Sequence, residues 1–420
     1  MTAEPASGDA KHDGWFSPAE QRIVDAFLEG TTVDLPLDDE QRTVRAHVLS
    51  QLLTGGLGVR SGSRSAMKIV GARITGVLDL ESTAVDAAIE LRQCLFEKAP
   101  NIKEAELRSF RLPSCHLPGL RAEGVRTKYD LDLNEGFIST GEVNLKGAHI
   151  GGTVHLDNAL LHNPAGRALM GSRMIIDGAL LARALTAVGQ IRLISTRVGG
   201  LLSLNKAHLS AHGSPAFQGE RLEVGESLYL IDVRAEGRFV LQNAVIEGGL
   251  NGSRAHFSSS EESGSCLKLL RTRIGLNAYF ERTTFTGDVY GPAATIGILL
   301  YLGGALFDET AKLDLHQITA SRLSLLTARP PGQVVLTNAR VDILDDDPDT
   351  WPRELRLTGF TYSMLHSSRE VTPAERLSWL HRDSYQPQPY QQLIAAYRQW
   401  GRSRTLAGSP WNCNVAGAAP

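Results

Sequence analysis

The sequence contains few cysteines, and they are scattered along the chain. The four thiols of this 420-residue protein are Cys94, Cys115, Cys266 and Cys413, and none belongs to a Cys-x-x-Cys pair. This pattern excludes a small secreted fold that is held together by disulfide bonds. We therefore expect a reducing compartment and predict a cytoplasmic protein.

Long apolar segments are also absent. The amino-terminal stretch MTAEPASGDAKHDGWF has no apolar core behind basic residues, so it lacks the pattern of a secretory signal. No apolar run reaches the length of about 18 residues that a membrane-spanning helix needs. The sequence predicts no membrane span, although peripheral association with a membrane stays open.

Neither sign of charge dominates. The chain has 43 Lys and Arg residues against 46 Asp and Glu residues, a formal net charge of -3. Binding to nucleic acid would need a basic surface, and imitation of DNA would need a dense negative one. We therefore predict no nucleic-acid partner.

Short catalytic motifs are missing as well. The nearest approach to a dinucleotide-binding Gly-x-Gly-x-x-Gly, TGGLGVRSG at 54–62, lacks the third glycine and a following helix. There is no phosphate-binding loop, no His-Glu-x-x-His and no Gly-x-Ser-x-Gly. We assign no catalytic, cofactor-binding or metal-binding residue, expect no cofactor, and lean against an enzyme.

What the sequence does contain is a repeat. From Leu145, apolar residues follow at steps of 5, 6, 5 and 8, which sum to 24, and the same register continues at Leu169, Leu193 and Leu241. Nearer the amino terminus, between 69 and 96, the repeat is about 22 residues long. Fixed periods of this size indicate a solenoid.

The sides of each coil are short strands. Pairs of apolar residues two positions apart, such as Val143 and Leu145 or Val154 and Leu156, indicate strands, and a Gly or Asn soon ends each alternation. The predicted fold is an all-β solenoid, a right-handed quadrilateral β-helix of the pentapeptide-repeat-like kind, with coils stacked about 4.8 Å apart. A narrow corner admits only small inward side chains, and these are expected two residues before an apolar position. They are Ala72, Ala148, Ala159, Thr196, Ala207, Ala244, Ala255, Thr283, Ala305 and Ala339.

Glycines and loops mark the predicted bends. Glycines follow the second apolar position, where we expect dihedral angles that few other residues adopt. They are Gly151, Gly152, Gly199, Gly200, Gly248 and Gly249. The long steps contain NPAG at 163–166, HGSP at 212–215 and SSSEESGS at 258–265, which recur in every second coil. We expect these loops to form a row on one side, which would be a contact surface.

The amino-terminal end is predicted to be helical. Ser17 and Glu20 have the spacing of a capping box, and LDDEQRTVRAHVLSQLLTGG predicts one amphipathic helix that ends at Gly55. Residues 15–56 should therefore form a helical cap over the first coil, which a solenoid needs for solubility. Residues 1–14 are predicted to be disordered.

The carboxy-terminal end follows the same plan. The β-helix is predicted over 66–362 and helices over 363–401, with a second capping box at Thr372 and Glu375. Residues 402–420 have no periodicity and are predicted to be disordered.

Several separated motifs resemble those of a bacterial family. They are RTVRAHVLSQLL, coils of the form VGARITGVLDL, ELRLTGFTY and PYQQLIAAYRQWG, and they span roughly residues 17–400. Members of this family are labelled pentapeptide-repeat-like proteins or membrane-associated oxidoreductases. The resemblance implies a β-helix and, through the second label, an oxidoreductase. Longer members continue into a basic segment and membrane helices, whereas this sequence continues after Arg404 into an Ala/Gly/Pro tail.

Three groups of polar residues could form sites, but a structural role is favoured for each. His149, His155 and His162 should lie on different sides of one coil, so they cannot share a metal ion. The acidic stretch 342–352 is expected to be a solvated loop rather than a cation site. Four arginines are expected to be scattered rather than to form an anion-binding face. They are Arg254, Arg271, Arg273 and Arg282.

Cys94 and Cys115 occupy small inward positions about one coil apart, so we expect them to stack. Two buried structural thiols are favoured, and a redox-sensitive pair is the alternative, because neighbouring coils bring the Cα atoms near disulfide range.

One face of the last helix is a candidate partner surface. It consists of Tyr390, Leu393, Ile394 and Tyr397, which either pack on the last coil or bind a partner helix. Packing is favoured for the apolar residues.

The function predicted from the sequence is a non-enzymatic scaffold or protein-interaction protein. It would use the row of loops or the last helix to contact a protein partner whose identity is unknown, and a homodimer is open. One alternative is an enzyme, an oxidoreductase by resemblance, with a site built from several coils. The other is a DNA mimic that shields topoisomerases, which the near-neutral charge disfavours.

Overall fold

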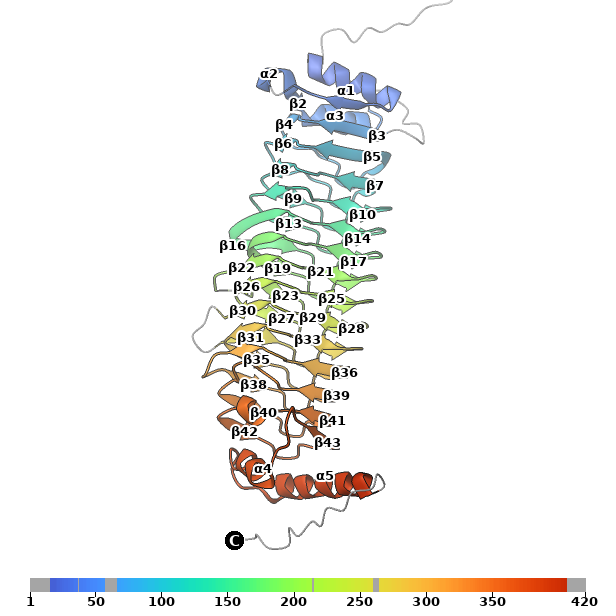
Figure 1. Cartoon of the computed structure of the whole chain (residues 1–420). Helices are drawn as coiled ribbons and strands as arrows, with labels where there is room; N and C mark the ends of the chain where they lie inside the picture. Colours follow the sequence, from blue (N-terminus) through green and yellow to red (C-terminus); the bar gives the residue numbers. More distant parts are fainter. Residues whose placement is uncertain (1–15, 37, 57–65, 214, 260–263, 406–420) are drawn as a thin grey trace, which may run out of the picture.

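The structure is a computed structural model that describes residues 16–36, 38–56, 66–213, 215–259 and 264–405. Within these residues the chain forms a parallel β-solenoid of about 13 turns with helices at both ends (Figure 1). The predicted all-β solenoid is therefore confirmed. The segment 1–14 and residues 406–420, both predicted to be disordered, lie outside the described residues. Residues 402–405, also predicted to be disordered, belong to the helix α5 (Pro387–Thr405).

Each coil has four sides. One coil consists of β14 (His149–Ile150), β15 (Val154–His155) and the two ends of β16 (Leu160–Met170). The first two sides of successive coils build a sheet of 22 strands, and the other two build a sheet of 21 strands. Strands pair in parallel from coil to coil, as β14 does with β17 (Ile175–Ile176) and β15 with β18 (Leu180–Leu181). These four ladders confirm the predicted quadrilateral β-helix.

The coils alternate in length, and this corrects the predicted constant period. Val143 pairs with Leu169 across a long coil, whereas Leu169 pairs with Ile191 across a shorter one. Side chains that bond across a long coil, such as Arg197 and Glu223, are 26 residues apart. Those that bond across a short coil, such as Asp232 and Arg254, are 22 residues apart. The predicted period was the mean of the two coil lengths.

The alternation places Leu169 in a different column from Leu145, Leu193 and Leu241. Those three leucines lie in one inward column. The coil between Leu145 and Leu193 contributes Gly171 to this column, and Leu169 lies two residues before Gly171. A Cβ atom at Gly171 would lie 2.7 Å from Leu193 Cδ2, so a larger residue there would require the Leu193 side chain to shift. A shift of two residues leaves a side chain on the same face of a strand. All four leucines are buried, and the apolar pattern cannot distinguish the two registers.

The first long coil contains a bulge where a loop was predicted. NPAG at 163–166 lies within β16, opposite the shorter β19 (Thr186–Arg192), and the register shifts between His162 and Arg167. Residues 164–167 are exposed. The extra residues are therefore accommodated by an extended bulge rather than by a separate loop.

The glycines at the predicted corners provide space rather than unusual dihedral angles, which corrects that expectation. None of the six has a positive φ, but a Cβ atom at Gly199 would lie 2.3 Å from the carbonyl oxygen of Asp177 in the preceding coil. Left-handed backbone occurs elsewhere, mostly at residues other than glycine. Arg173, Ala184 and Ser195 are evenly spaced examples, with φ of 60°, 52° and 54°.

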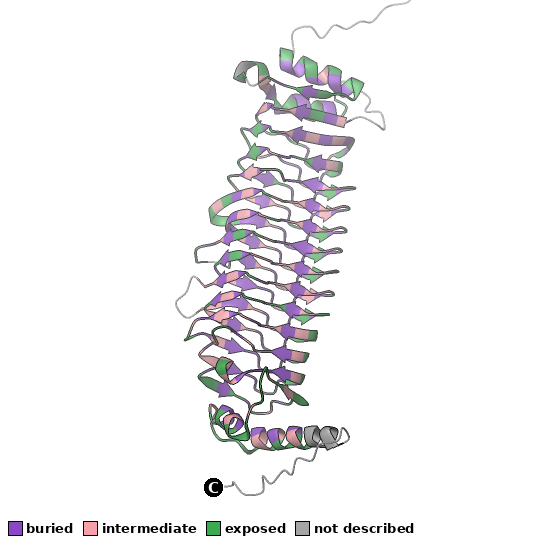
Figure 2. Cartoon of the chain, viewed as in Figure 1, coloured by how far each residue is buried: buried purple, intermediate pink, exposed green. Residues whose placement is uncertain are grey.

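The core runs the length of the solenoid, and buried residues recur in the strands of every coil (Figure 2). All ten small residues predicted at the corners are buried. The hydroxyl groups of Thr196 and Thr283 donate to the carbonyl oxygens of Gly171 and Gly252 at 2.6 and 2.7 Å, so these inward threonines are satisfied. Phenylalanines stack from coil to coil in the second half of the core. Their ring centroids are 4.3 Å apart for Phe217 and Phe239 and 4.7 Å apart for Phe285 and Phe307.

The amino-terminal cap begins with α1 (Pro18–Glu29), and Ser17 and Glu20 form the predicted capping box. β1 (Thr32–Asp34) follows and pairs with β3 (Ala66–Val70) of the first coil. The cap thus pairs with the exposed edge of the solenoid as well as covering its apolar end.

The single helix predicted up to Gly55 is divided in two. α2 (Asp39–Arg42) and α3 (Ala46–Leu53) are separated by β2 (Thr43–Arg45), which pairs with β4 (Arg73–Thr75). Strand pairing with the first coil and burial of Val44 override the helical pattern, and β-branched Thr43 and Val44 suit a strand.

The carboxy-terminal cap contains α4 (Pro373–Leu380) and α5 (Pro387–Thr405), after a last strand, β43 (Met364–His366). Thr372 and Glu375 form the predicted capping box of α4. α5 lies across the end of the solenoid (Figure 1).

Two glutamines attach α5 to the last coil. Gln388 and Gln392 donate from Nε2 to the carbonyl oxygens of Phe360 and Tyr362 at 3.0 and 2.6 Å. The helix therefore provides hydrogen-bond donors to two carbonyl groups at the end of the solenoid, just before β43.

The acidic stretch at 342–352 is largely buried, which corrects the expectation of a solvated loop. Asp345, Asp346 and Asp347 are between 1% and 8% exposed. Asp346 accepts from both Nη atoms of Arg376 at 2.5 and 3.0 Å and from Trp351 Nε1 at 2.8 Å. The stretch therefore joins the last coils to α4 through an internal ion pair.

Candidate functional site

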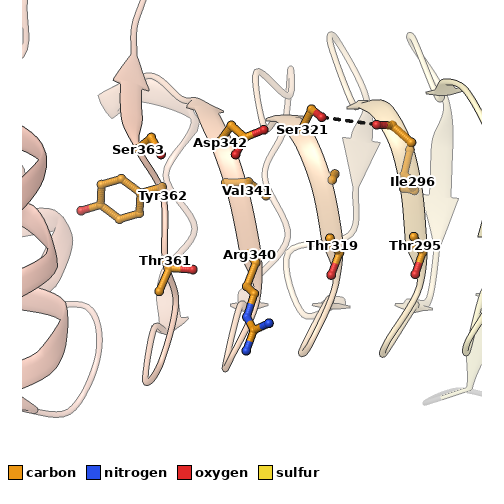
Figure 3. Close-up of a pocket in the computed structure, with 12 residues that line it drawn as sticks. Thr295, Ile296, Thr319, Ser321, Arg340, Val341, Asp342, Thr361, Tyr362 and Ser363 are labelled. Atoms are coloured by element: carbon orange, nitrogen blue, oxygen red, sulfur yellow. Dashed lines mark hydrogen bonds between the residues drawn. The ribbon is translucent and has the colours of Figure 1, made fainter.

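A shallow groove crosses the outside of four coils near the carboxy-terminal end (Figure 3). It is formed by β36 (Thr295–Tyr301), β39 (Thr319–Ser324), β41 (Arg340–Asp345) and residues 361–363, and its volume is about 400 Å³.

The groove has two walls. One wall is a column of register partners, Thr295, Thr319, Arg340 and Thr361. The other wall lies two residues further along each strand. It consists of Gly297, Ser321, Asp342 and Ser363. The residues between the walls, such as Ile296 and Val341, are buried, so the floor is formed by the backbone of the sheet.

The groove exists because the outward side chains become short. In the same column as Thr295, earlier coils carry Arg197, Glu223, Val245 and Arg273, and three of these four side chains are longer than threonine. Gly297 could not be larger, because a Cβ atom there would lie 1.9 Å from the carbonyl oxygen of Gly275. Short side chains and a tight corner together leave the hollow.

Two charges in the walls have no partner among the described residues. Arg340 and Asp342 are exposed and form neither an ion pair nor a side-chain hydrogen bond with the part of the chain that the structure describes. Some charges elsewhere on this sheet pair between coils, as Arg197 does with Glu223 at 2.6 Å. That hydrogen bond from Arg197 lowers the pKa of the Glu223 carboxyl. Other charges on the sheet, such as Arg126 and Arg273, form no ion pair with a described residue. The groove therefore keeps one cation and one anion available for a ligand.

The predicted thiols lie side by side in the core. The Cys94 backbone N–H donates to Cys115 Sγ at 3.3 Å, and Cys115 Sγ donates to the carbonyl oxygen of Leu91 at 3.0 Å. Both side chains are buried and unbonded to one another. Burial, followed by the neighbouring Cys94, raises the pKa of Cys115 well above its usual value. This environment disfavours the reactive thiolate.

The candidate helix face divides between packing and exposure. Leu393 is buried, and Tyr390 and Tyr397 are half-buried against the core. Ile394 is 42% exposed. One residue of the four is thus open to a partner while the other three attach α5 to the last coil.

The other candidates do not converge. His149 pairs with Asp177 at 3.1 Å, and His155 and His162 lie on the next two sides of the coil. Arg254 pairs with Asp232 at 2.8 Å, and this hydrogen bond raises the pKa of its guanidinium. Arg282 lies at a left-handed corner one coil further on. These side chains form no common site.

No family model, curated protein or solved structure matches the chain. The β-solenoid that the family resemblance implies is present, but nothing in these comparisons supports the pentapeptide-repeat or oxidoreductase label. Among the helices that the structure describes, none has both the length and the apolar character needed to cross a bilayer.

The groove is not evident from the periodicity of the sequence. Its signal is present as TIG, TAS, RVD and TYS, which begin at 295, 319, 340 and 361 and carry a short or charged residue on either side of an inward one. Because the coil length varies, a fixed period misaligns these triplets, and the groove becomes visible only in the true register.

Proposed function

We propose that the protein is a non-enzymatic scaffold that binds another protein through the groove over β36, β39 and β41. The observation that carries this proposal is the presence of two unpartnered charges, Arg340 and Asp342, in a groove otherwise lined by hydroxyl groups and backbone. An extended segment lying along the groove would meet a guanidinium that binds carboxylates and a carboxylate that accepts from amide or ammonium groups.

The solenoid supports this role by holding the groove rigidly. The parts of its walls on β36, β39 and β41 belong to strands that are paired on both sides, and the inward residues between the walls are buried in the core. A recognition surface on regular strands loses little conformational entropy when it binds. The lining contains Thr, Ser, Arg and Asp side chains and neither imidazole nor amine groups, which suits binding by hydrogen bonds.

Two further elements belong to the proposal. The exposed side of α5 around Ile394 is a second contact region for the same partner. We place the protein in the cytoplasm, which agrees with neighbouring thiols at Cys94 and Cys115 that remain free.

Site-specific photo-crosslinking tests the proposed surface. A photoreactive amino acid replaces Thr319 in the groove wall of the full-length protein, and the captured partner is identified by mass spectrometry and purified. Calorimetry then compares the binding of that partner to the wild type and to Arg340→Glu/Asp342→Lys. We expect at least a tenfold loss of affinity in the variant, because both charge contacts become repulsive.

Arg126 provides a matched control, because it occupies the same outward column near the other end of the solenoid. Arg126→Glu should bind the partner as the wild type does. Equal affinity of the groove variant and the wild type would refute the proposal, and so would a crosslinking yield at Thr319 no greater than at Arg126.

A further inference from the structure

Arg111, Asp132 and His155 form a ladder across three successive coils. They end β7 (Glu106–Arg111), β11 (Leu131–Asp132) and β15, and Asp132 is the register partner of both neighbours. Arg111 Nε donates to Asp132 Oδ2 at 2.5 Å. Asp132 Oδ1 lies 3.7 Å from His155 Nε2. The carboxylate is thus held by a cation on one side and faces an imidazole on the other.

Asp132 is deeply buried but only half satisfied. Its residue is 4% exposed, and Oδ1 makes no hydrogen bond to any described residue. The 3.7 Å separation from His155 Nε2 is too long for a hydrogen bond. An unpaired buried carboxylate oxygen is costly. Its position opposite an imidazole nitrogen therefore favours a cation bound between the two atoms.

Asp130 supplies a third ligand atom. The oxygen and nitrogen atoms that Asp130, Asp132 and His155 can offer all lie within 4.8 Å of one another. The backbone N–H of Thr153 donates to Asp130 Oδ1 at 2.8 Å, which orients that carboxylate. Gly152 leaves the necessary room, because a Cβ atom there would lie 2.2 Å from the same oxygen.

We propose that Asp130, Asp132 and His155 bind a divalent transition-metal ion, for which Zn²⁺ is the best fit. One imidazole and two carboxylates are ligands that Zn²⁺ accepts, and hard ions such as Ca²⁺ prefer more oxygen atoms. Two ligand atoms on one tetrahedral zinc ion lie about 3.4 Å apart. The 3.7 Å between Asp132 Oδ1 and His155 Nε2 is close to this value, and the widest pair, which lies within 4.8 Å, has to close by at most about 1.4 Å.

The surroundings suit a divalent ion. Arg111 offsets one of the two carboxylates, so the three charged groups together carry a single negative charge. The His155 side chain is 26% exposed, which gives the ion a path from solvent. Three protein ligands leave coordination positions for water or for a donor group of a ligand.

A second cluster, in which Asp345 and His366 lie in the same column and Arg322 lies two residues before the register partner of Asp345, shows how the pattern looks when it is complete without an ion. Asp345 accepts from Arg322 through both oxygens at 2.5 and 2.7 Å, and its Oδ1 lies 3.0 Å from His366 Nδ1. Ile343 occupies the place that corresponds to Asp130. The extra carboxylate and the unpaired oxygen are therefore specific to the ladder at Asp132.

Zinc titration of the full-length, tag-free protein tests the proposal. After dialysis against a chelator, isothermal titration calorimetry with ZnCl₂ and elemental analysis of the complex should give one tightly bound equivalent. His155→Gln and Asp130→Asn should each weaken this binding by at least about tenfold, because each removes one ligand. His366→Gln is the matched control and should bind zinc as the wild type does.

Cobalt provides a second readout that does not depend on affinity alone. One equivalent of Co²⁺ should produce a visible absorption band in the wild type and in His366→Gln but not in His155→Gln. Three results would each overturn the proposal: no bound equivalent in the wild type, unchanged binding in both ligand variants, or an equal loss in His366→Gln. Circular dichroism of each variant excludes unfolding as the cause of a loss.

Discussion

The buried ion pair between Asp346 and Arg376 should be the main attachment of the carboxy-terminal cap. Both residues are at most 2% exposed, and Arg376 lies 5.2 Å from the ring centre of Trp351 and 5.4 Å from that of Trp379. Arg376→Met removes the cation but keeps much of the side-chain volume. The Asp346 carboxylate then stays buried with only Trp351 and Ser367 as donors.

The expected cost of Arg376→Met is about 3–5 kcal/mol, the range for breaking one side of a buried ion pair. Two charge-assisted hydrogen bonds of about 1.5–3 kcal/mol each give a similar figure. Asp346→Asn in the same chain should recover most of the loss, because the amide oxygen still accepts from Trp351 and no charge remains buried. This recovery distinguishes electrostatics from lost packing.

The assay is urea unfolding followed by tryptophan fluorescence, because Trp351 and Trp379 flank the pair. Caps and coils of a solenoid can unfold in separate steps, so the transition of the carboxy-terminal end is the relevant one. A loss below about 1 kcal/mol in the single variant would refute the reasoning. A double variant no more stable than Arg376→Met would refute it as well.

Three further predictions concern the corners, the thiols and the effect of acid. Ala184→Gly should stabilise the fold by about 0.5–1 kcal/mol in urea unfolding, because glycine relieves the strain of the left-handed backbone at this position. Ala84→Gly, in an extended strand, should destabilise the fold. A lower free energy of unfolding in Ala184→Gly would contradict this explanation. Burial raises the pKa of Cys266 to about 12 and that of Cys115 well above normal, so both thiols should resist a thiol reagent at about pH 8 until the protein unfolds; rapid native labelling of either would show that burial is wrong. Hydrogen bonds from Arg369 and then Thr372 lower the pKa of Glu375 from 4.5 to about 2, so its stabilisation is present above about pH 4.5 and is lost as the pH falls towards 2. Glu375→Gln should flatten the pH profile of the urea midpoint in that window, and an unchanged profile would contradict the assignment.

The sequence was sufficient for features that depend on local patterns. Inward apolar residues alternate with outward ones, small residues occupy narrow corners, and the capping boxes at Ser17 and Thr372 depend on residues three positions apart. Each of these is a short-range relation, so it can be recognised without knowing which coil lies next to which.

Features that depend on neighbouring coils could not be predicted in the same way. A shift of two residues keeps every side chain on its face, so the alternation of long and short coils was averaged to one constant period. Asp346 was expected in solvent because its partner, Arg376, lies far along the chain in another element.

The candidate sites depend on the same missing information. Asp132 and His155 lie on successive coils and become neighbours only in the observed register. The groove likewise requires Thr319 to be aligned with Arg340 on the next coil. Function was therefore harder to predict than fold, since both sites are formed between coils.

The groove, the proposed metal site and the cap contacts all depend on the register of the coils. Disulfide trapping tests this register directly. Arg197 and Glu223 are register partners, whereas the constant period predicted from the sequence would pair Arg197 with Arg221. Adjacent strands place partner Cα atoms about 4.8 Å apart, within disulfide range. In a Cys413→Ser background, Arg197→Cys/Glu223→Cys should crosslink rapidly under mild oxidation, and Arg197→Cys/Arg221→Cys should not. Preferential crosslinking of the second pair would contradict the structure described above.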